Sequence, residues 1–267
     1  DALAAVHLGI HVAHIHGGER SGTLDESFRH VISKLAHIHL PATEDAAARL
    51  RRMGERDESI FVIGAPGLVG VAGRAARDRV ATARSVGLDA NRPIALVVFH
   101  PVVQEAALAA VQFATLVAAI RSKGFQMVLF RPNSDAGGRR IDSVIDGLEG
   151  QSDIRVVTHL ERDAYLDILQ NADLMIGNSS SGIIESASFA VPCVNVGSRQ
   201  NGRLRNANTI DCDTFTVPAL SEAITRSQSL ERRGENLYGA GDTDRRLLDL
   251  IDRLDLHPDL LNKLNAD

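Results

Sequence analysis

The chain has 267 residues, of which 44% are hydrophobic and 24% charged, an ordinary composition for a globular protein with one large domain or two modest ones. A net charge of −5 and an aromatic content of only 4%, without tryptophan, argue against nucleic acid as a partner, which needs a basic face or stacking side chains. With two cysteines, no signal peptide and no apolar stretch long enough to span a membrane, we expect a cytoplasmic protein with free thiols and no membrane contact.

Strand-like and helix-like segments alternate along the chain, which predicts an α/β protein with parallel sheets and crossover helices. The predicted strands lie at residues 11–15, 60–63, 94–99, 125–130, 154–157, 174–176 and 191–196. The predicted helices lie at residues 26–35, 44–53, 104–123, 162–170, 182–189 and 245–256. The strands from residue 94 onward are continuous apolar runs, as expected when helices cover both faces of a sheet.

Two domains and a C-terminal helix are predicted. Residues 1–75 carry too few strands to close a doubly wound sheet, and they open inside a helical pattern without an initiator methionine. We therefore expect them to be the C-terminal part of a first Rossmann-like domain that is incomplete at its N-terminus. Residues 76–238 are predicted to form a second Rossmann-like domain, and residues 239–267 to return a helix to the first. The boundary lies in the charged, Ala- and Arg-rich stretch 73–91, which carries its own amphipathic helix.

A dense set of titratable side chains follows the first predicted strand. His14 and His16 leave this strand on one face, because strand side chains alternate. Residues 23–26, Thr-Leu-Asp-Glu, are typical of a capping box, and Asp25 and Arg29 are neighbours on the helix that follows. Two histidines could ligate a metal, but no further cysteine or histidine–carboxylate set completes a shell, so we predict no metal. The cluster provides general acids and bases beside a cation that could hold a diphosphate: His16, Glu19, Asp25, Arg29 and His30.

A second candidate site lies at residues 174–185, where an apolar strand is followed by small residues and a helix. Free backbone N–H groups and the positive end of the helix dipole would then point at one spot, which suits phosphate. Ser179, Ser180 and Ser181 add hydroxyl donors, and the Glu185 carboxylate could accept hydrogen bonds from ribose hydroxyls. The alternative is a serine-rich helix cap that binds no ligand.

Three other predicted strands also end in polar or basic residues. His100 follows the strand at 94–99, Asn133 and Asp135 follow the strand at 125–130, and Arg199 follows the strand at 191–196. The carboxyl ends of parallel strands share one edge, where ligands bind in open α/β sheets. We therefore expect four strand ends, including that of the serine-rich strand, to face one crevice. An arginine at that edge can pair with phosphate.

Together these motifs resemble the hydrolysing UDP-N-acetylglucosamine 2-epimerases, of the type that supplies the synthesis of sialic-acid-like sugars. The resemblance extends from about residue 14 to about residue 211 and rests on blocks at residues 14–19, 21–30, 64–67, 100–102, 132–138, 177–185 and 197–200. It implies two Rossmann-like domains facing a cleft, as in GT-B glycosyltransferases, with UDP on the second domain and the sugar on the first.

The resemblance also implies roles for individual residues. Ser179, Ser180 and Glu185 would bind phosphate and ribose, and Arg199 and His100 would reach the diphosphate. On the nucleotide side, the residues implied are Asn133 and Asp135, and around the sugar they are Glu19, Asp25, Arg29 and His30. Many family members have a carboxylate where this chain has His16, so the base could be His16, Glu19 or Asp25.

The implied reaction removes the C2 proton, expels UDP to give a glycal, and adds water with inversion at C2, without any cofactor. We expect a UDP-sugar substrate and a homo-oligomer, either a dimer or a tetramer. Three alternatives stay open: a non-hydrolysing epimerase that returns UDP-N-acetylmannosamine, a catalytically inactive UDP-binding fragment, and, less favoured, a glycosyltransferase of the same architecture.

Overall fold

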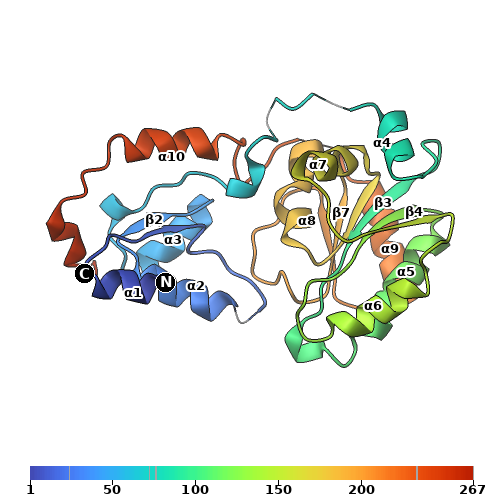
Figure 1. Ribbon diagram of the computed structural model, residues 1–267, viewed down its shortest axis with the longest axis horizontal. Helices are drawn as coiled ribbons and strands as arrows, with labels where there is room; N and C mark the ends of the chain where they lie inside the picture. The colour runs from blue at the N-terminus through green and yellow to red at the C-terminus, as the bar shows by residue number, and fades with distance from the viewer. Residues whose placement is uncertain (24, 72, 76, 233, 267) are drawn as a thin grey trace. The chain divides into compact units, whose positions relative to one another are not determined.

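The computed structural model describes residues 1–23, 25–71, 73–75, 77–232 and 234–266. The chain divides into two compact units, drawn in Figure 1. Unit 1 comprises Asp1–Gly73, Asn201–Leu204 and Asn236–Asp267, and unit 2 comprises Arg74–Gln200 and Arg205–Glu235. None of the described helices is long and apolar enough to cross a membrane.

Unit 2 is built on a parallel sheet with the strand order β5-β4-β3-β6-β7-β8. From β3 the chain steps outward through β4 to β5, and then returns to the other side of β3 through β6, β7 and β8. The order therefore reverses between β3 and β6, and the carboxyl edge at such a reversal is where open α/β sheets bind ligands. The strands are β3 Ile94–Val98, β4 Gln126–Phe130, β5 Ile154–Val157, β6 Leu174–Gly177, β7 Cys193–Val196 and β8 Thr209–Cys212.

Helices cover both faces of this sheet, which explains its continuous apolar strands. In β3, Ala95 and Val97 point into the core beneath α5 and α9, whereas Leu96 and Val98 point into the opposite core beneath α4 and α7. The register pairs Leu96 with a neighbour on each side, Val128 of β4 and Met175 of β6. The helices are α4 Arg79–Ser85, α5 Ala109–Ser122, α6 Gly138–Asp146, α7 Arg162–Asn171, α8 Ser180–Ile184 and α9 Val217–Gln228.

Unit 1 contains two short parallel strands, β1 Ala13–Ile15 and β2 Ile38–Leu40. Leu250 of the C-terminal helix packs against Ile38, Leu40 and Ile63, so the tail belongs to the core of this unit. The helices of unit 1 are α1 Ala2–His7, α2 Asp25–Leu35, α3 Glu44–Arg52 and α10 Thr243–Ile251, with 3-10 turns at Asp57–Ser59, Pro66–Leu68 and Pro258–Leu261.

The prediction of α/β structure with parallel sheets is confirmed, but the strand predicted at residues 60–63 is wrong. It is reduced to one bridge, between His39 and Ile60. Two hydrogen bonds of a parallel ladder do form, from Phe61 N–H to the His39 carbonyl and from Ile63 N–H to the Pro41 carbonyl. Since Pro41 has no N–H, it cannot make the return bond, and the ladder stops.

Several predicted helix limits also differ from the structure. The helix predicted at 104–123 begins with a 3-10 turn at Val103–Glu105 before α5, and the one predicted at 182–189 divides into α8 and a 3-10 turn at Ser186–Phe189. The predicted capping box is altered, because the Glu26 carboxylate accepts from the backbone N–H of Ser21 rather than of Thr23. Leu24, within the box, lies outside the described residues. Both cysteines are buried free thiols, as predicted.

Candidate functional site

In unit 2, four neighbouring strands end at one edge of the sheet: β4, β3, β6 and β7. Arg131 directly follows β4, His100 lies two residues beyond β3, Asn178 directly follows β6, and Gly197 directly follows β7. The polar segments that were predicted to follow these strands therefore begin next to one another at this edge. Arg131 itself is paired with acidic side chains of α6 and the turn after it, at 2.9–3.3 Å.

Asn178 joins the ends of β3 and β6 at the reversal in strand order. Its Oδ1 accepts from the backbone N–H of His100 at 2.7 Å, and its Nδ2 donates to the His100 carbonyl at 2.7 Å. The residue before it, Gly177, has φ +141°, and a Cβ there would lie 2.0 Å from the Val98 carbonyl oxygen. Only glycine fits this approach of two backbones. Sequence reasoning did not single out Asn178, although its place at the start of the serine turn was a usable signal.

Arg199 and Gln200 close over the same turn. The Nη1 of Arg199 donates to the Asn178 carbonyl at 3.1 Å, and the Nε2 of Gln200 donates to the same oxygen at 2.8 Å. Arg205 in turn donates to the Gln200 carbonyl at 2.9 Å. The predicted Arg199 is thus held at the carboxyl edge of the sheet rather than extended into solvent.

His100 is a neutral hydrogen-bond donor at this edge. Its Nδ1 accepts from the backbone N–H of Asn133 at 3.2 Å, which assigns the ring hydrogen to Nε2. Burial and, to a smaller extent, the nearby charge of Arg199 together lower the pKa of His100 to about 4, against a smaller opposite effect of Asp135. The ring therefore presents an uncharged N–H at neutral pH. Asn133 also donates to Asp135 at 2.6 Å on the exposed loop before α6.

The three serines of the turn differ in what their hydroxyls do. Ser179 caps α8, and its Oγ accepts from the backbone N–H of Ser181 at 3.3 Å. The Ser181 hydroxyl donates to Glu185 Oε2 at 2.5 Å. Ser180 makes no side-chain hydrogen bond to any residue that the structure describes. The cap predicted as the alternative is therefore present at Ser179, and Ser180 is the hydroxyl left for a ligand.

In unit 1, one cavity of about 340 Å³ gathers four of the residues predicted to act on the sugar. The cavity is formed by the end of β1, by α2 and by the segment Asn201–Leu204. The predicted His30 does not line it, since its Nε2 lies 3.2 Å from Glu26 Oε1. The lining residues are His14, Ile15, His16, Glu19, Asp25, Phe28, Arg29, Ile32 and Arg203.

His16 directly follows β1 in a strained backbone conformation. Its φ of +63° is in the left-handed region, which residues other than glycine seldom occupy and which is concentrated at functional sites. Its Nε2 is buried, accepts no hydrogen bond from any described residue, and lies 4.0 Å from Glu19 Oε1. Burial lowers the pKa of His16 to about 4, helped by the charges of Arg203 and Arg29. This imidazole is therefore uncharged at neutral pH, with one ring nitrogen unprotonated.

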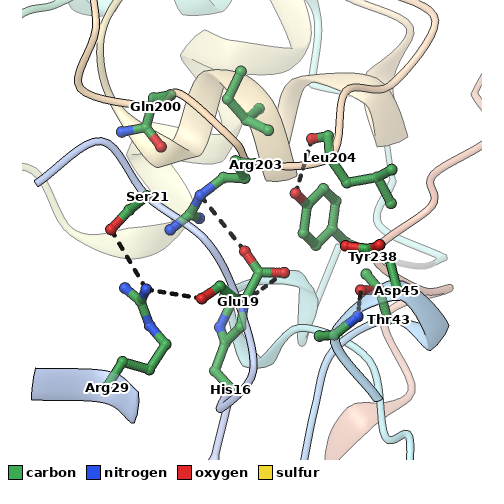
Figure 2. A network of polar contacts seen from close by, with 12 residues as sticks. His16, Glu19, Ser21, Arg29, Thr43, Asp45, Gln200, Arg203, Leu204 and Tyr238 are labelled. Carbon is green, nitrogen blue, oxygen red and sulfur yellow. Dashed lines mark hydrogen bonds and ion pairs between the residues drawn. The ribbon is translucent and has the colours of Figure 1, made fainter. Parts of the chain in front are cut away.

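Glu19 is buried among arginines (Figure 2). Its Oε2 lies 3.6 Å from Nε of Arg203, and Arg29 donates to its carbonyl at 3.2 Å and to Ser21 Oγ at 3.4 Å. Burial raises the pKa of Glu19, whereas the charges of Arg203, Arg29 and Arg49 lower it. The sequence alone gave Arg203 no role, because its partner lies far back in the chain. Among the described residues no three His, Cys, Asp or Glu side chains come together to hold a metal ion.

Residues 1–252 match the family of UDP-N-acetylglucosamine 2-epimerases. The chain belongs to this family. Two relatives illustrate how much of an epimerase it spans. It is 45% identical over 268 aligned positions to the UDP-N,N'-diacetylbacillosamine 2-epimerase (hydrolyzing) of Legionella pneumophila, covering 99% of this chain and 70% of the relative. It is 36% identical over 234 positions to the UDP-N-acetylglucosamine 2-epimerase of Neisseria meningitidis, covering 87% of this chain and 61% of the relative.

Solved structures of 2-epimerases share the fold. The Neisseria meningitidis UDP-GlcNAc 2-epimerase bound to UDP-GlcNAc superimposes with a TM-score of 0.74 at 13% identity, covering 95% of this chain and 72% of that protein. The Methanocaldococcus jannaschii enzyme in complex with UDP-GlcNAc and UDP gives 0.73 at 18% identity, with the same coverage. The predicted family and its GT-B-like α/β fold are confirmed.

Proposed function

We propose that the protein is a hydrolysing 2-epimerase of a UDP-N-acetylhexosamine. The observation that carries this proposal is the cavity of unit 1, where a neutral imidazole, a buried carboxylate and two arginines lie together. Abstraction of a proton from carbon needs a positioned base, and loss of a diphosphate needs neighbouring positive charge. His16 and Glu19 meet the first need, and Arg29 and Arg203 contribute to the second.

The nucleotide would bind at the carboxyl edge of unit 2. The His100 Nε2–H, the Ser180 hydroxyl and the Arg199 guanidinium are suited to phosphate oxygens, because each is a donor next to the reversal in strand order. Asn133 and Asp135 would line the nucleotide, and Glu185 would accept from ribose hydroxyls. Ser181 would contribute through Glu185, since its own hydroxyl hydrogen is directed there.

In the proposed reaction the base takes the C2 proton, and the C2–H electron pair becomes the C1=C2 double bond while the C1–O bond to UDP breaks. Water then adds its hydroxyl group to C1, and a proton returns to C2 on the opposite face. The products are UDP and the free 2-epimeric sugar. His16 is the proposed base, with Glu19 as the partner that stabilises its protonated form, and Asp25 and Arg29 complete the sugar side.

The names of the relatives support two substrates: UDP-N-acetylglucosamine and its diacetylated relative, UDP-N,N'-diacetylbacillosamine. A role in the synthesis of sialic-acid-type sugars stays a prediction. The hydrolysing outcome is favoured over the non-hydrolysing one by the 45% identical relative, which is named as hydrolyzing. The chain spans 61–70% of the length of these relatives. A UDP-binding module without turnover is the second candidate. The cytoplasmic location and the homo-oligomer stay predictions.

The function is tested by analysing the products formed from each UDP-sugar. We expect free UDP in equal amount to a free 2-epimeric sugar. Intact UDP-N-acetylmannosamine as the sole product would replace the proposal by a non-hydrolysing epimerase. UDP binding without any turnover would favour the binding module.

A further inference from the structure

Beside the serine turn of unit 2, four side chains form a closed ring of contacts. Arg162 Nη1 donates to Glu185 Oε1 at 2.9 Å, and Ser181 Oγ donates to Glu185 Oε2 at 2.5 Å. The hydroxyl of Tyr165 is hydrogen-bonded to the Ser181 hydroxyl. The set of contacts is closed because the Arg162 guanidinium lies 5.9 Å from the centre of the Tyr165 phenol group, in cation–π contact. Both Arg162 and Tyr165 belong to α7, which follows β5.

The hydrogen bonds of this ring have one possible direction. Ser181 has a single hydroxyl hydrogen, which it gives to the carboxylate, so Tyr165 must donate to the Ser181 oxygen. Burial raises the pKa of Tyr165, as does the Glu185 charge, so the phenol keeps its hydrogen. Donors aligned in this way strengthen one another.

The ring leaves Glu185 with a defined set of free acceptor positions. The residue is 8% exposed, and each carboxylate oxygen has one donor from the ring. A carboxylate can accept about four hydrogen bonds, so each oxygen keeps room for roughly one more. Two adjacent acceptors on a carboxylate that cannot rotate match two adjacent hydroxyl groups, as in the cis-diol of ribose.

We propose that Arg162 is a positioning residue for Glu185, and that with Tyr165 and Ser181 it makes unit 2 select a ribonucleoside diphosphate over its 2′-deoxy counterpart. The proposal rests on the nucleotide site of the proposed function. Arg162 holds the carboxylate by one oxygen and is itself held by the aromatic ring beneath it. Loss of the guanidinium frees the carboxylate to turn, and the two hydroxyl groups of the ligand then lose their paired acceptors.

The test is calorimetric titration of wild type and Arg162→Met with UDP and with 2′-deoxy-UDP. Methionine keeps an unbranched side chain about as far as arginine Nε, but it removes the guanidinium with its charge and donors. We expect wild type to bind UDP about tenfold more tightly than 2′-deoxy-UDP. In Arg162→Met this preference should fall to within about twofold, chiefly through weaker UDP binding. Arg162→Lys, which restores a cation, should recover part of the preference.

Two further variants keep the result interpretable. Arg155→Met removes an exposed arginine from β5 of the same unit and should leave the preference unchanged. Tyr165→Phe keeps the aromatic face but removes the donor to Ser181, so it should lower the preference for UDP. It provides a second test of the contacts around Glu185 if Arg162→Met does not fold. An unchanged preference in the folded variants overturns the role of Arg162. A wild-type protein that binds neither nucleotide overturns the nucleotide site itself, and with it the proposed function.

Discussion

His16 and His100 are both neutral imidazoles at neutral pH, but they differ in the hydrogen bonds that they already make. Burial lowers both pKa values to about 4. His100 accepts at Nδ1 from Asn133 and so presents a donor at Nε2. His16 has a buried Nε2 that accepts no hydrogen bond from the described residues. A donor suits phosphate and an acceptor suits a proton on carbon, which is why the base is assigned to His16.

Replacement of His16 by asparagine separates its chemistry from its backbone strain. Asparagine tolerates the left-handed conformation at φ +63°, so His16→Asn should change the free energy of unfolding by no more than about 1 kcal/mol. Turnover should fall by about 100-fold or more, the usual contribution of a general base. Urea unfolding and an assay of UDP release measure the two effects. Full activity in a folded His16→Asn protein would exclude His16 as the base.

The pH dependence of turnover distinguishes His16 from Glu19 as the base. The pKa of His16 is lowered to about 4, so its lone pair is available above that pH and is lost only as the pH falls through about 4. The pKa of Glu19 is raised, so a base at Glu19 would lose activity at a higher pH, above its ordinary value of 4.5. In a profile of kcat/KM from pH 3.5 to 8, we expect activity to fall only near pH 4. A limb above 4.5 that persists in His16→Asn would assign the base to Glu19.

The residues of the unit 1 cavity that the sequence predicted are those that lie close together in the chain. His16, Glu19, Asp25 and Arg29 fall within one short run, so strand and helix periodicity already place them together. Arg203 could not be assigned in this way, because its contact with Glu19 joins distant segments. His30 does not line this cavity, because helix periodicity places it beside Glu26, four residues before it. Its role at the sugar stays a prediction.

At the scale of elements, a buried carboxylate ties the C-terminal tail to unit 1. Glu55 is 2% exposed and lies 2.8 Å from Lys34 of α2, 2.8 Å from His39 of β2 and 2.6 Å from Lys263 of the tail. Lys263 also donates to the carbonyls of Ser33 and Ala36. One lysine thereby fixes the end of the chain to the end of α2.

Lys263→Met should loosen this tail. It removes one of the cations around Glu55 and leaves two carbonyls without their donor, so we expect a loss of about 2 kcal/mol in the free energy of unfolding at pH 7. Urea unfolding measures the loss, and limited proteolysis should cut the tail faster. Lys123→Met, at an exposed lysine after α5, is the matched control. Equal stability of Lys263→Met and wild type would mean that the cluster does not hold the tail.

The pH dependence of stability should have the same origin. Lysine hydrogen bonds lower the pKa of Glu55 despite its burial, so the stability it contributes is present above 4.5 and is lost as the pH falls through the lowered pKa. Burial lowers the pKa of His39 to about 4, so stability also declines between about pH 6.5 and 4, where only the unfolded chain binds this proton. Acidification should therefore destabilise unit 1, and Lys263→Met should reduce the part due to Glu55.

Local sequence signals predicted the elements of unit 2 better than those of unit 1. Largely apolar runs marked the strands β3, β4, β6 and β7, since a covered parallel sheet allows little polar alternation, and the edge strand β5 was marked by Ile154, Val156 and Val157. The strand predicted at residues 60–63 failed for a reason outside the segment itself, the missing N–H of Pro41 on its neighbour. The helix α9 was not predicted, although its Thr216 cap, which accepts from Ala219 N–H, and Pro218 beside it are start signals in the sequence.

At the scale of the whole molecule, local sequence patterns could not predict which segments belong to which unit. Asn201–Leu204 is assigned to unit 1, although the residues on both sides of it belong to unit 2. No change of composition marks these points, since Arg199 and Arg203 belong to one continuous polar run. Arg203 and Leu204 make long-range contacts with Glu19 and Tyr238, which belong to unit 1. The domain limits 1–75, 76–238 and 239–267 stay predictions.

Every version of the proposed function, whether enzyme or binding module, requires UDP to bind at the carboxyl edge of unit 2. Calorimetric titration of UDP into wild type and Arg199→Ala tests this requirement most directly, with Arg155→Ala as a control for the loss of one positive charge. We expect Arg199→Ala to weaken UDP binding by about 1–3 kcal/mol, the usual cost of a lost charge-assisted hydrogen bond, and Arg155→Ala to leave it unchanged. Equal affinity of wild type and Arg199→Ala, or no binding by wild type, would contradict the account.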